Sequence, residues 1–272
     1  MHLCLSIPAS SAEETAHNRQ DILRSFAEQP IARRMQPALR CSLAELVAQE
    51  SREVTALLDA LSAARGVLQC VCTGDLQQQV HRLESVLKQT GVTRTNLPPI
   101  VLGFALPHAH SLDAEVLASL NRIAQGCQVF IDVAGPRPEM QKRISEILQL
   151  PNRRLHIAID TASYLIGNPT SSVEVMLQRN IHQLGALILR DAPPEVSGNP
   201  PGQPLPLGGD GLIDHARVAQ ILRDVAFAGP CILDLRPNLD GSIDGSDRKE
   251  KSEHPHFADA MQHLEICGWF GR

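Results

Sequence analysis

Residues 155–189, LHIAIDTASYLIGNPTSSVEVMLQRNIHQLGALIL, decide the fold because they hold a complete strand, helix and strand. The apolar runs at 155–159 and 186–189 have the length and composition of buried strands. Between them, Ser171 stands three residues before Glu174, the spacing of a capping box at a helix start. Gly185 falls where this helix should end, since glycine enters a left-handed cap without steric penalty. The stretch predicts two parallel strands joined by a helix.

Strand-like apolar runs recur along the whole chain. Six more lie at 3–7, 38–41, 67–72, 99–106, 127–133 and 231–235, and helical patterns separate most of the eight. Ser42 and Asp75 begin two further capping boxes. Eight strands covered by helices predict an α/β fold, a single (β/α)8 TIM barrel that fills residues 1–272 as one domain. An open doubly wound sheet is the alternative, but its usual G-x-G-x-x-G motif is missing after the first run.

The composition argues against a membrane protein and against a nucleic-acid-binding protein. The chain has 272 residues, of which 43% are hydrophobic and 20% charged, and no stretch approaches the length of a membrane span. Its net charge of −5 and 3% aromatic content predict that it binds neither nucleic acid nor membrane. Six of the seven cysteines lie in or beside the strand-like runs, and the first run starts at once at the N-terminus. We therefore expect a soluble, cytoplasmic protein with reduced core thiols.

Two long polar segments interrupt the alternation of strands and helices. Residues 191–211 are rich in proline and glycine, and residues 236–256 are polar and mixed in charge. In a barrel both would follow the last two strands at the carboxyl-terminal face, where active-site loops belong.

Four aspartates stand at or just after the ends of the last four runs: Asp132, Asp160, Asp191 and Asp234. A single aspartate there could simply cap a helix, but four on consecutive strands indicate a shared site. Carboxylates that converge on a partly dry barrel mouth repel each other, so the site should contain a positive group or take up protons.

From about residue 126 onward, the chain resembles the xylose-isomerase-like TIM barrels, a superfamily of sugar isomerases, epimerases, related dehydratases and type IV AP endonucleases. The matching motifs occur in chain order. They are Gly126-Cys-Gln-Val-Phe-Ile-Asp132, Ile157-Ala-Ile-Asp160-Thr161-Ala-Ser163, Leu187-Ile188-Leu189-Arg190-Asp191, Pro206-Leu207 with Gly209-Asp-Gly211-Leu-Ile-Asp214, and Phe227-Ala-Gly229-Pro-Cys-Ile-Leu-Asp234.

The resemblance implies a divalent cation held by Glu, Asp, His and Glu on strands five to eight. This chain has Asp132, Asp160, Ile188 and Asp234 at those positions, and Ser163 replaces a further histidine of the family. One ligand is therefore apolar and two carboxylates are a methylene shorter, so an ideal four-ligand cage is not expected.

Three cationic partners for the carboxylates remain open. Mg²⁺, Mn²⁺ or Zn²⁺ could bind Asp132, Asp160 and Asp234 together with water. Arg190 lies two residues beyond Ile188 on the same strand face, and its guanidinium could replace the ion, leaving no cofactor. His108 and His110 could lean in from the loop after strand four, although they could equally belong to an ordinary polar loop.

A glycine-rich run precedes the helix expected near Asp214. Gly209 and Gly211 could expose amides that bind a phosphate or carboxylate of the substrate, or could serve only a sharp loop. His108 and His110 are the other candidate substrate-binding residues.

Two functions follow. In the first, the protein is an isomerase, epimerase or related lyase that abstracts a proton next to a carbonyl of a small polyol or keto substrate. Asp132 and Asp234 would then act as bases or metal ligands, Asp160 would anchor the cation, and Arg190 would stabilise the enolate. Asp191 completes the candidate catalytic set. In the second, the barrel has lost the chemistry and serves as a metal-free binding or partner subunit. The oligomeric state stays open.

Overall fold

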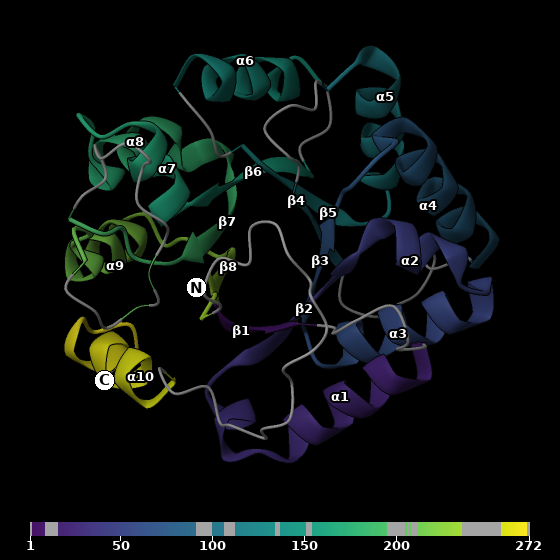
Figure 1. The fold of residues 1–272 in the computed structure, drawn as a ribbon, viewed down its shortest axis with the longest axis horizontal. Helices are drawn as coiled ribbons and strands as arrows, with labels where there is room; N and C mark the ends of the chain where they lie inside the picture. Colours follow the sequence, from purple (N-terminus) through teal and green to yellow (C-terminus); the bar gives the residue numbers. More distant parts are fainter. Residues whose placement is uncertain are drawn as a thin grey trace.

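A computed structural model of the chain describes residues 2–8, 16–90, 100–105, 112–133, 137–150, 154–194, 205, 207, 211–235 and 257–270. Eight parallel strands form a closed barrel in chain order, with helices around it (Figure 1). The strands are β1 His2–Pro8, β2 Gln36–Ser42, β3 Val67–Val71, β4 Val101–Ala105, β5 Gln128–Asp132, β6 Leu155–Asp160, β7 Leu184–Leu189 and β8 Pro230–Leu233. The single (β/α)8 barrel is confirmed, and each strand overlaps one expected apolar run.

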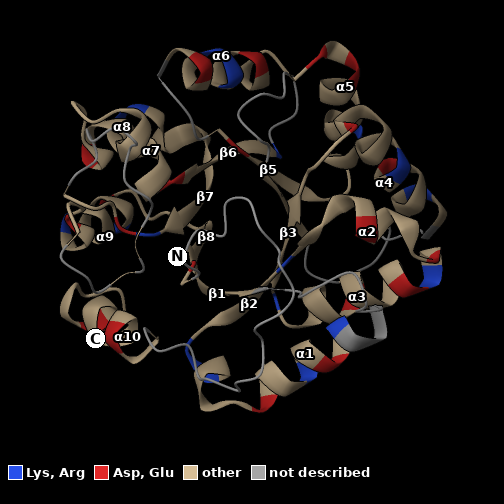
Figure 2. Ribbon diagram, viewed as in Figure 1, with Lys and Arg blue, Asp and Glu red and all other residues tan. Residues whose placement is uncertain are grey.

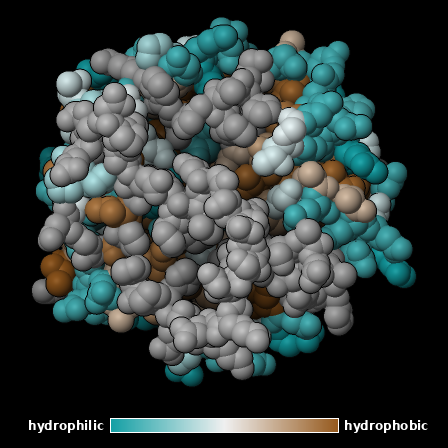
Figure 3. All heavy atoms as spheres, in the orientation of Figure 1, coloured by the Kyte–Doolittle hydropathy of each residue, from teal (hydrophilic) through white to brown (hydrophobic). Residues whose placement is uncertain are grey.

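The outer layer consists of helices that connect successive strands, and of one helix, α10, that follows the last strand. They are α1 Ala16–Glu28, α2 Leu43–Ala48, α3 Ser51–Ala63, α4 Leu76–Thr90, α5 Ala114–Ile123, α6 Arg137–Leu148, α7 Thr161–Gly167, α8 Val173–Asn180, α9 His215–Asp224 and α10 Phe257–Ile266, with short 3-10 turns at Pro30–Arg33 and Ile181–Gln183. Within the described ranges, most charged residues lie on these helices (Figure 2), and hydrophilic side chains dominate the visible surface over α4 to α6 (Figure 3). No helix within the described ranges is long and apolar enough to cross a membrane.

The local signals at helix starts are mostly confirmed. Ser42 Oγ accepts from the Glu45 amide at 3.4 Å, and Asp75 Oδ1 accepts from the Gln78 amide at 3.0 Å. The third cap is displaced by one residue, because Ser172 and not Ser171 accepts the amide, that of Val175.

Gly185 does not end a helix, so that prediction is wrong. It lies inside β7, where a Cβ atom would come within 2.5 Å of the Cβ of His156 on β6. Glycine is required there because two strands approach closely, and not because the chain turns.

The barrel interior is built in layers of side chains from alternate strands. The bottom layer comes from the odd strands and contains Cys4, Val67, Phe130 and Ala186, and the next layer comes from the even strands and contains Ala38, Gly103, Ala158 and Ile232. All of these except Gly103 belong to one buried apolar cluster. Gly103 leaves room for Phe130, whose ring occupies the space that a Cβ atom at position 103 would need.

Two residues further along most of the strands, the same inward face becomes polar; on β4 and β7 it stays apolar, with Ala105 and Ile188. The third layer contains Ser6, Gln69, Asp132 and Ile188, and the rim above it contains Arg40, Asp160 and Asp234. Except for Ala105 and Ile188, the named members of these upper layers are all polar, so the fold directs its inward polar groups to the carboxyl ends of the strands.

Candidate functional site

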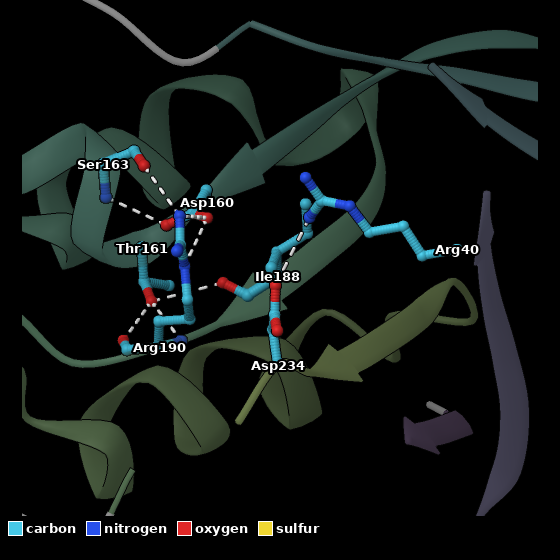
Figure 4. Close-up of polar contacts among 7 residues, drawn as sticks. All are labelled: Arg40, Asp160, Thr161, Ser163, Ile188, Arg190 and Asp234. Atoms are coloured by element: carbon cyan, nitrogen blue, oxygen red, sulfur yellow. Dashed lines mark hydrogen bonds and ion pairs between the residues drawn. The ribbon is translucent and has the colours of Figure 1, made fainter. Parts of the chain in front are cut away.

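Asp160 is fixed at the end of β6 by the helix that it begins. Its Oδ1 accepts the backbone N–H of Ser163 at 2.9 Å, so the aspartate is the N-cap of α7. Only 3% of the residue is exposed. The other oxygen, Oδ2, faces Arg190 of the next strand, and Figure 4 shows the two side chains turned toward each other.

Arg190 forms a buried ion pair with Asp160. Nε and Nη2 donate to Asp160 Oδ2 at 2.8 and 2.5 Å, and Nη2 also donates to Ser163 Oγ at 3.0 Å. Thr161 fixes the arginine backbone, because its hydroxyl donates to the Arg190 carbonyl at 2.6 Å and accepts from the Arg190 amide at 3.1 Å. Residues 160–163 thus bind both the guanidinium and the backbone of Arg190.

Three carboxylates act on that guanidinium. Burial works against the charge of Arg190, but Asp160, Asp234 and Asp132 outweigh it and raise its pKa above the ordinary value. The arginine therefore stays protonated, and it supplies the positive charge that the converging carboxylates require.

Asp234 meets a second arginine that the sequence analysis missed. Arg40 Nη1 lies 3.5 Å from Asp234 Oδ2, and the side chains are 26% and 2% exposed. Figure 4 shows Arg40 reaching toward Asp234 from β2. The sequence does contain a signal for this residue, because Arg40 is a charged residue within the apolar run 38–41 and lies on the inward face of that strand.

Asp132 lies near a third arginine. Arg143 of α6 is only 5% exposed. Its burial lowers the pKa of the guanidinium, and Asp132 is the foremost of the carboxylates that oppose this shift. Asp132 itself is partly exposed at the end of β5, so it is more accessible than Asp160 or Asp234.

These residues do not fit the divalent cation that the resemblance implies. Ile188 provides no ligand atom, while Asp160 and Asp234 both face guanidinium groups. Within the described part of the chain, no group of three or more His, Cys, Asp or Glu side chains could hold a metal ion. The Arg190 guanidinium instead pairs with Asp160 and interacts electrostatically with Asp234 and Asp132.

Asp191 lies apart from the other three aspartates. It follows Arg190, so its side chain points to the outer side of β7, where Oδ1 accepts the amides of Ala192 at 2.8 Å and Ile213 at 3.1 Å. Its Oδ2 lies 3.7 Å from Nε2 of the buried His215. Asp191 thus joins the chain after β7 to the start of α9.

Gly211 packs directly against the Asp191 carboxylate, where a Cβ atom would overlap it. The predicted substrate-binding role of Gly211 therefore gains no support from its surroundings. His108, His110 and Gly209 lie outside the described residues, as do 195–204, 206 and 208–210 of the first long segment and all of 236–256.

Comparisons with solved structures identify the same architecture. A D-psicose 3-epimerase determined in the presence of D-fructose aligns with 100% of this chain and 98% of its own, at 11% identity and a TM-score of 0.58. An L-ribulose 3-epimerase aligns over 97% and 93%, at 12% identity and 0.57. A xylose isomerase domain protein from Planctomyces limnophilus aligns over 97% and 92%, at 13% identity and 0.56.

No protein-family model and no curated protein sequence matches the chain. The chain has the fold of the xylose-isomerase-like TIM barrels, which confirms the resemblance at the level of the fold. At the mouth of this barrel, Arg190 pairs with Asp160 and Arg40 pairs with Asp234.

Proposed function

We propose that the protein is an isomerase or epimerase that abstracts a proton next to a carbonyl group of a small polyol or keto substrate without a bound cation. A related dehydration would use the same first step. The observation that carries the proposal is the buried Arg190 guanidinium, which lies within electrostatic reach of Asp132, Asp160 and Asp234. The fold that the chain shares with sugar epimerases supports the class of reaction.

The chemistry requires a base and a group that stabilises negative charge. A carboxylate of Asp132 or Asp234 takes the proton from the carbon, and the C–H electron pair forms the enolate double bond. The carbonyl electrons move to oxygen, where the Arg190 guanidinium stabilises the charge. Return of a proton to the opposite face of the same carbon gives the epimer. Return of the proton to the former carbonyl carbon gives the isomer when the proton of the adjacent hydroxyl group moves to the enolate oxygen, so that the new carbonyl forms at the neighbouring carbon.

The positions of the two bases suit this sequence of steps. Asp132 at the end of β5 and Asp234 just after β8 lie on either side of the ion pair between Asp160, at the end of β6, and Arg190, just after β7. One oxygen of Asp160 binds Arg190 and the other caps α7, so its role is to orient the arginine.

Proton exchange tests the proposal directly. The protein, treated with EDTA, is incubated in D2O with D-fructose, D-tagatose and L-ribulose, and deuterium at the carbon next to the carbonyl is followed by NMR. We expect incorporation by the wild type and a loss of about 100-fold or more in Asp132→Asn or Asp234→Asn, since general bases contribute about that much. Lys142→Ala on the exposed side of α6 is the control and should exchange normally.

A binding barrel without chemistry is the second candidate. It is favoured by Ile188 and by the arginines that already neutralise Asp160 and Asp234. A protein of this kind would bind a sugar and show no exchange at any concentration, and that result would exclude the enzyme.

A further inference from the structure

Two polar side chains of the third layer have no role in the chemistry described above. Ser6 on β1 and Gln69 on β3 point into the barrel at the level of Asp132 and Ile188, because inward side chains of alternate strands share a layer. They lie directly above the apolar cluster that contains Cys4 and Val67. They lie on the β1 to β3 side of the mouth, across the barrel from Asp132 on β5 and Asp160 on β6.

Both side chains are buried, and one polar atom of each has no hydrogen-bond partner among the described residues. Ser6 is 6% exposed and Gln69 is 4% exposed. Within the described part of the chain, neither Ser6 Oγ nor Gln69 Oε1 has a partner. A buried polar atom without a partner lowers the stability of the fold, so a polar group retained there calls for a ligand that completes it.

The neighbouring charges favour an uncharged ligand. Arg40 pairs in register with Gln69 and carries a positive charge, but its guanidinium faces the carboxylate of Asp234. Arg190 is likewise matched by Asp160. In these described layers, each arginine is balanced by an aspartate, so the site has no excess positive charge to bind a phosphate or carboxylate.

The start of α9 does not supply a phosphate site either. Asp214 Oδ1 caps the helix by accepting the Arg217 amide at 2.8 Å. The Ile213 amide donates to the buried carboxylate of Asp191, which also lies against Gly211. Two carboxylates of the chain itself therefore occupy the position that an anionic group of a substrate would need.

We propose that Ser6 and Gln69 form a substrate-binding subsite that takes neighbouring hydroxyl groups of an uncharged polyhydroxy carbonyl compound. Gln69 Oε1 accepts from one hydroxyl, and Ser6 Oγ exchanges a hydrogen bond with the next. This arrangement holds the carbonyl end of the substrate toward Asp132 and Arg190. The inference rests on the proposed function for the reacting end of the substrate, whereas the subsite itself is tested by binding alone.

Isothermal titration calorimetry with D-fructose, D-tagatose, L-ribulose and D-fructose 6-phosphate measures the affinities. We expect at least one uncharged sugar to saturate the wild type and to bind more tightly than the phosphorylated one. Ser6→Ala and Gln69→Leu should each weaken its binding by about tenfold, the effect of one lost hydrogen bond. The exposed substitutions Ser85→Ala and Gln141→Leu are matched controls and should bind like the wild type.

Thermal unfolding separates this role from a structural one. Removal of a buried polar atom that has no partner should raise Tm in the ligand-free protein, by about 2–4 °C for each kcal/mol recovered. A lower Tm in both Ser6→Ala and Gln69→Leu would mean that these side chains support the fold, and would overturn the proposal.

Three binding results would also overturn the subsite: wild-type affinity in both variants, preference for the phosphorylated sugar, or binding of none of the four sugars. These failures are distinct from failure of the proposed function. Deuterium exchange that persists with an unchanged KM in both variants rejects the subsite alone. Sugar binding that depends on Ser6 and Gln69 without any exchange rejects the enzyme alone.

Discussion

Arg190 donates two hydrogen bonds to a single carboxylate oxygen of Asp160, from Nε at 2.8 Å and from Nη2 at 2.5 Å. The side chains are 13% and 4% exposed, so this ion pair is largely removed from water. It connects the ends of β6 and β7 at the point where the resemblance implies a cation.

Breaking this pair should destabilise the fold strongly. Arg190→Met leaves the buried Asp160 carboxylate without its partner, so we expect a loss of about 3–5 kcal/mol in the free energy of unfolding, measured by urea denaturation at pH 7. Asp160→Asn should cost a similar amount, and the double variant less than the sum of the two, since it leaves no unpaired charge. In the exposed Arg24 and Asp21 pair, Arg24→Met should cost under about 0.5 kcal/mol. Additive losses in the double variant would contradict the coupling.

A second prediction concerns metal content. Because the guanidinium neutralises the carboxylates, purified protein should hold less than stoichiometric Mg²⁺, Mn²⁺ or Zn²⁺, and EDTA should leave Tm unchanged. The variant Ile188→His with Arg190→Leu restores a ligand and removes the competing charge, so Mn²⁺ should raise its Tm. Ile188→His alone is the matched control and should respond less, since Arg190 remains. Stoichiometric metal in the wild type that disappears in Asp160→Ala would show that a cation and not Arg190 completes the site.

The barrel could be predicted from the sequence because each strand is a mainly apolar run between helical patterns. The inward positions of Asp160 and Arg190 also followed from strand alternation. Counting two residues beyond the apolar inward positions Cys4, Ala38 and Val67 would have found Ser6, Arg40 and Gln69 as well, but only once the inward face of each strand is known.

The choice of partners could not be predicted in this way. The sequence indicated that Arg190 could face the carboxylates, but which aspartate it binds depends on β6 and β7 being neighbours and on Thr161 fixing its backbone. The burial of Arg143 is harder to predict, because an arginine on a helix ordinarily faces solvent. Its position near Asp132 arises from the packing of α6. Alternation does explain Asp191, which follows Arg190 and therefore points outward.

The interior packing gives a third prediction. Gly103→Ala would drive a methyl group into the ring of Phe130, so we expect a loss of about 1–3 kcal/mol in the free energy of unfolding. Phe130→Leu makes room for this methyl group. The double variant should therefore lose less free energy of unfolding than the two single variants lose together. Chemical denaturation of the four proteins at one temperature measures the coupling. Equal and additive losses would mean that the ring moves aside without cost.

The last prediction uses a carboxylate far from the site. Glu84 of α4 accepts from Arg122 Nε at 2.7 Å and Nη2 at 2.9 Å, and these hydrogen bonds lower its pKa from 4.5 to about 2 despite its burial. A carboxylate with a depressed pKa in the folded state stabilises the fold above its unfolded pKa, and that stability is lost as pH falls from about 5 toward 2. Glu84→Gln should therefore lower Tm at pH 7, and the difference from the wild type should shrink steadily below pH 5. Asp21→Asn, at the exposed pair with Arg24, should show little difference at any pH. A Tm difference for Glu84→Gln that stays constant from pH 7 to pH 3 would mean that the ion pair between α4 and α5 does not depend on the charge of this carboxylate.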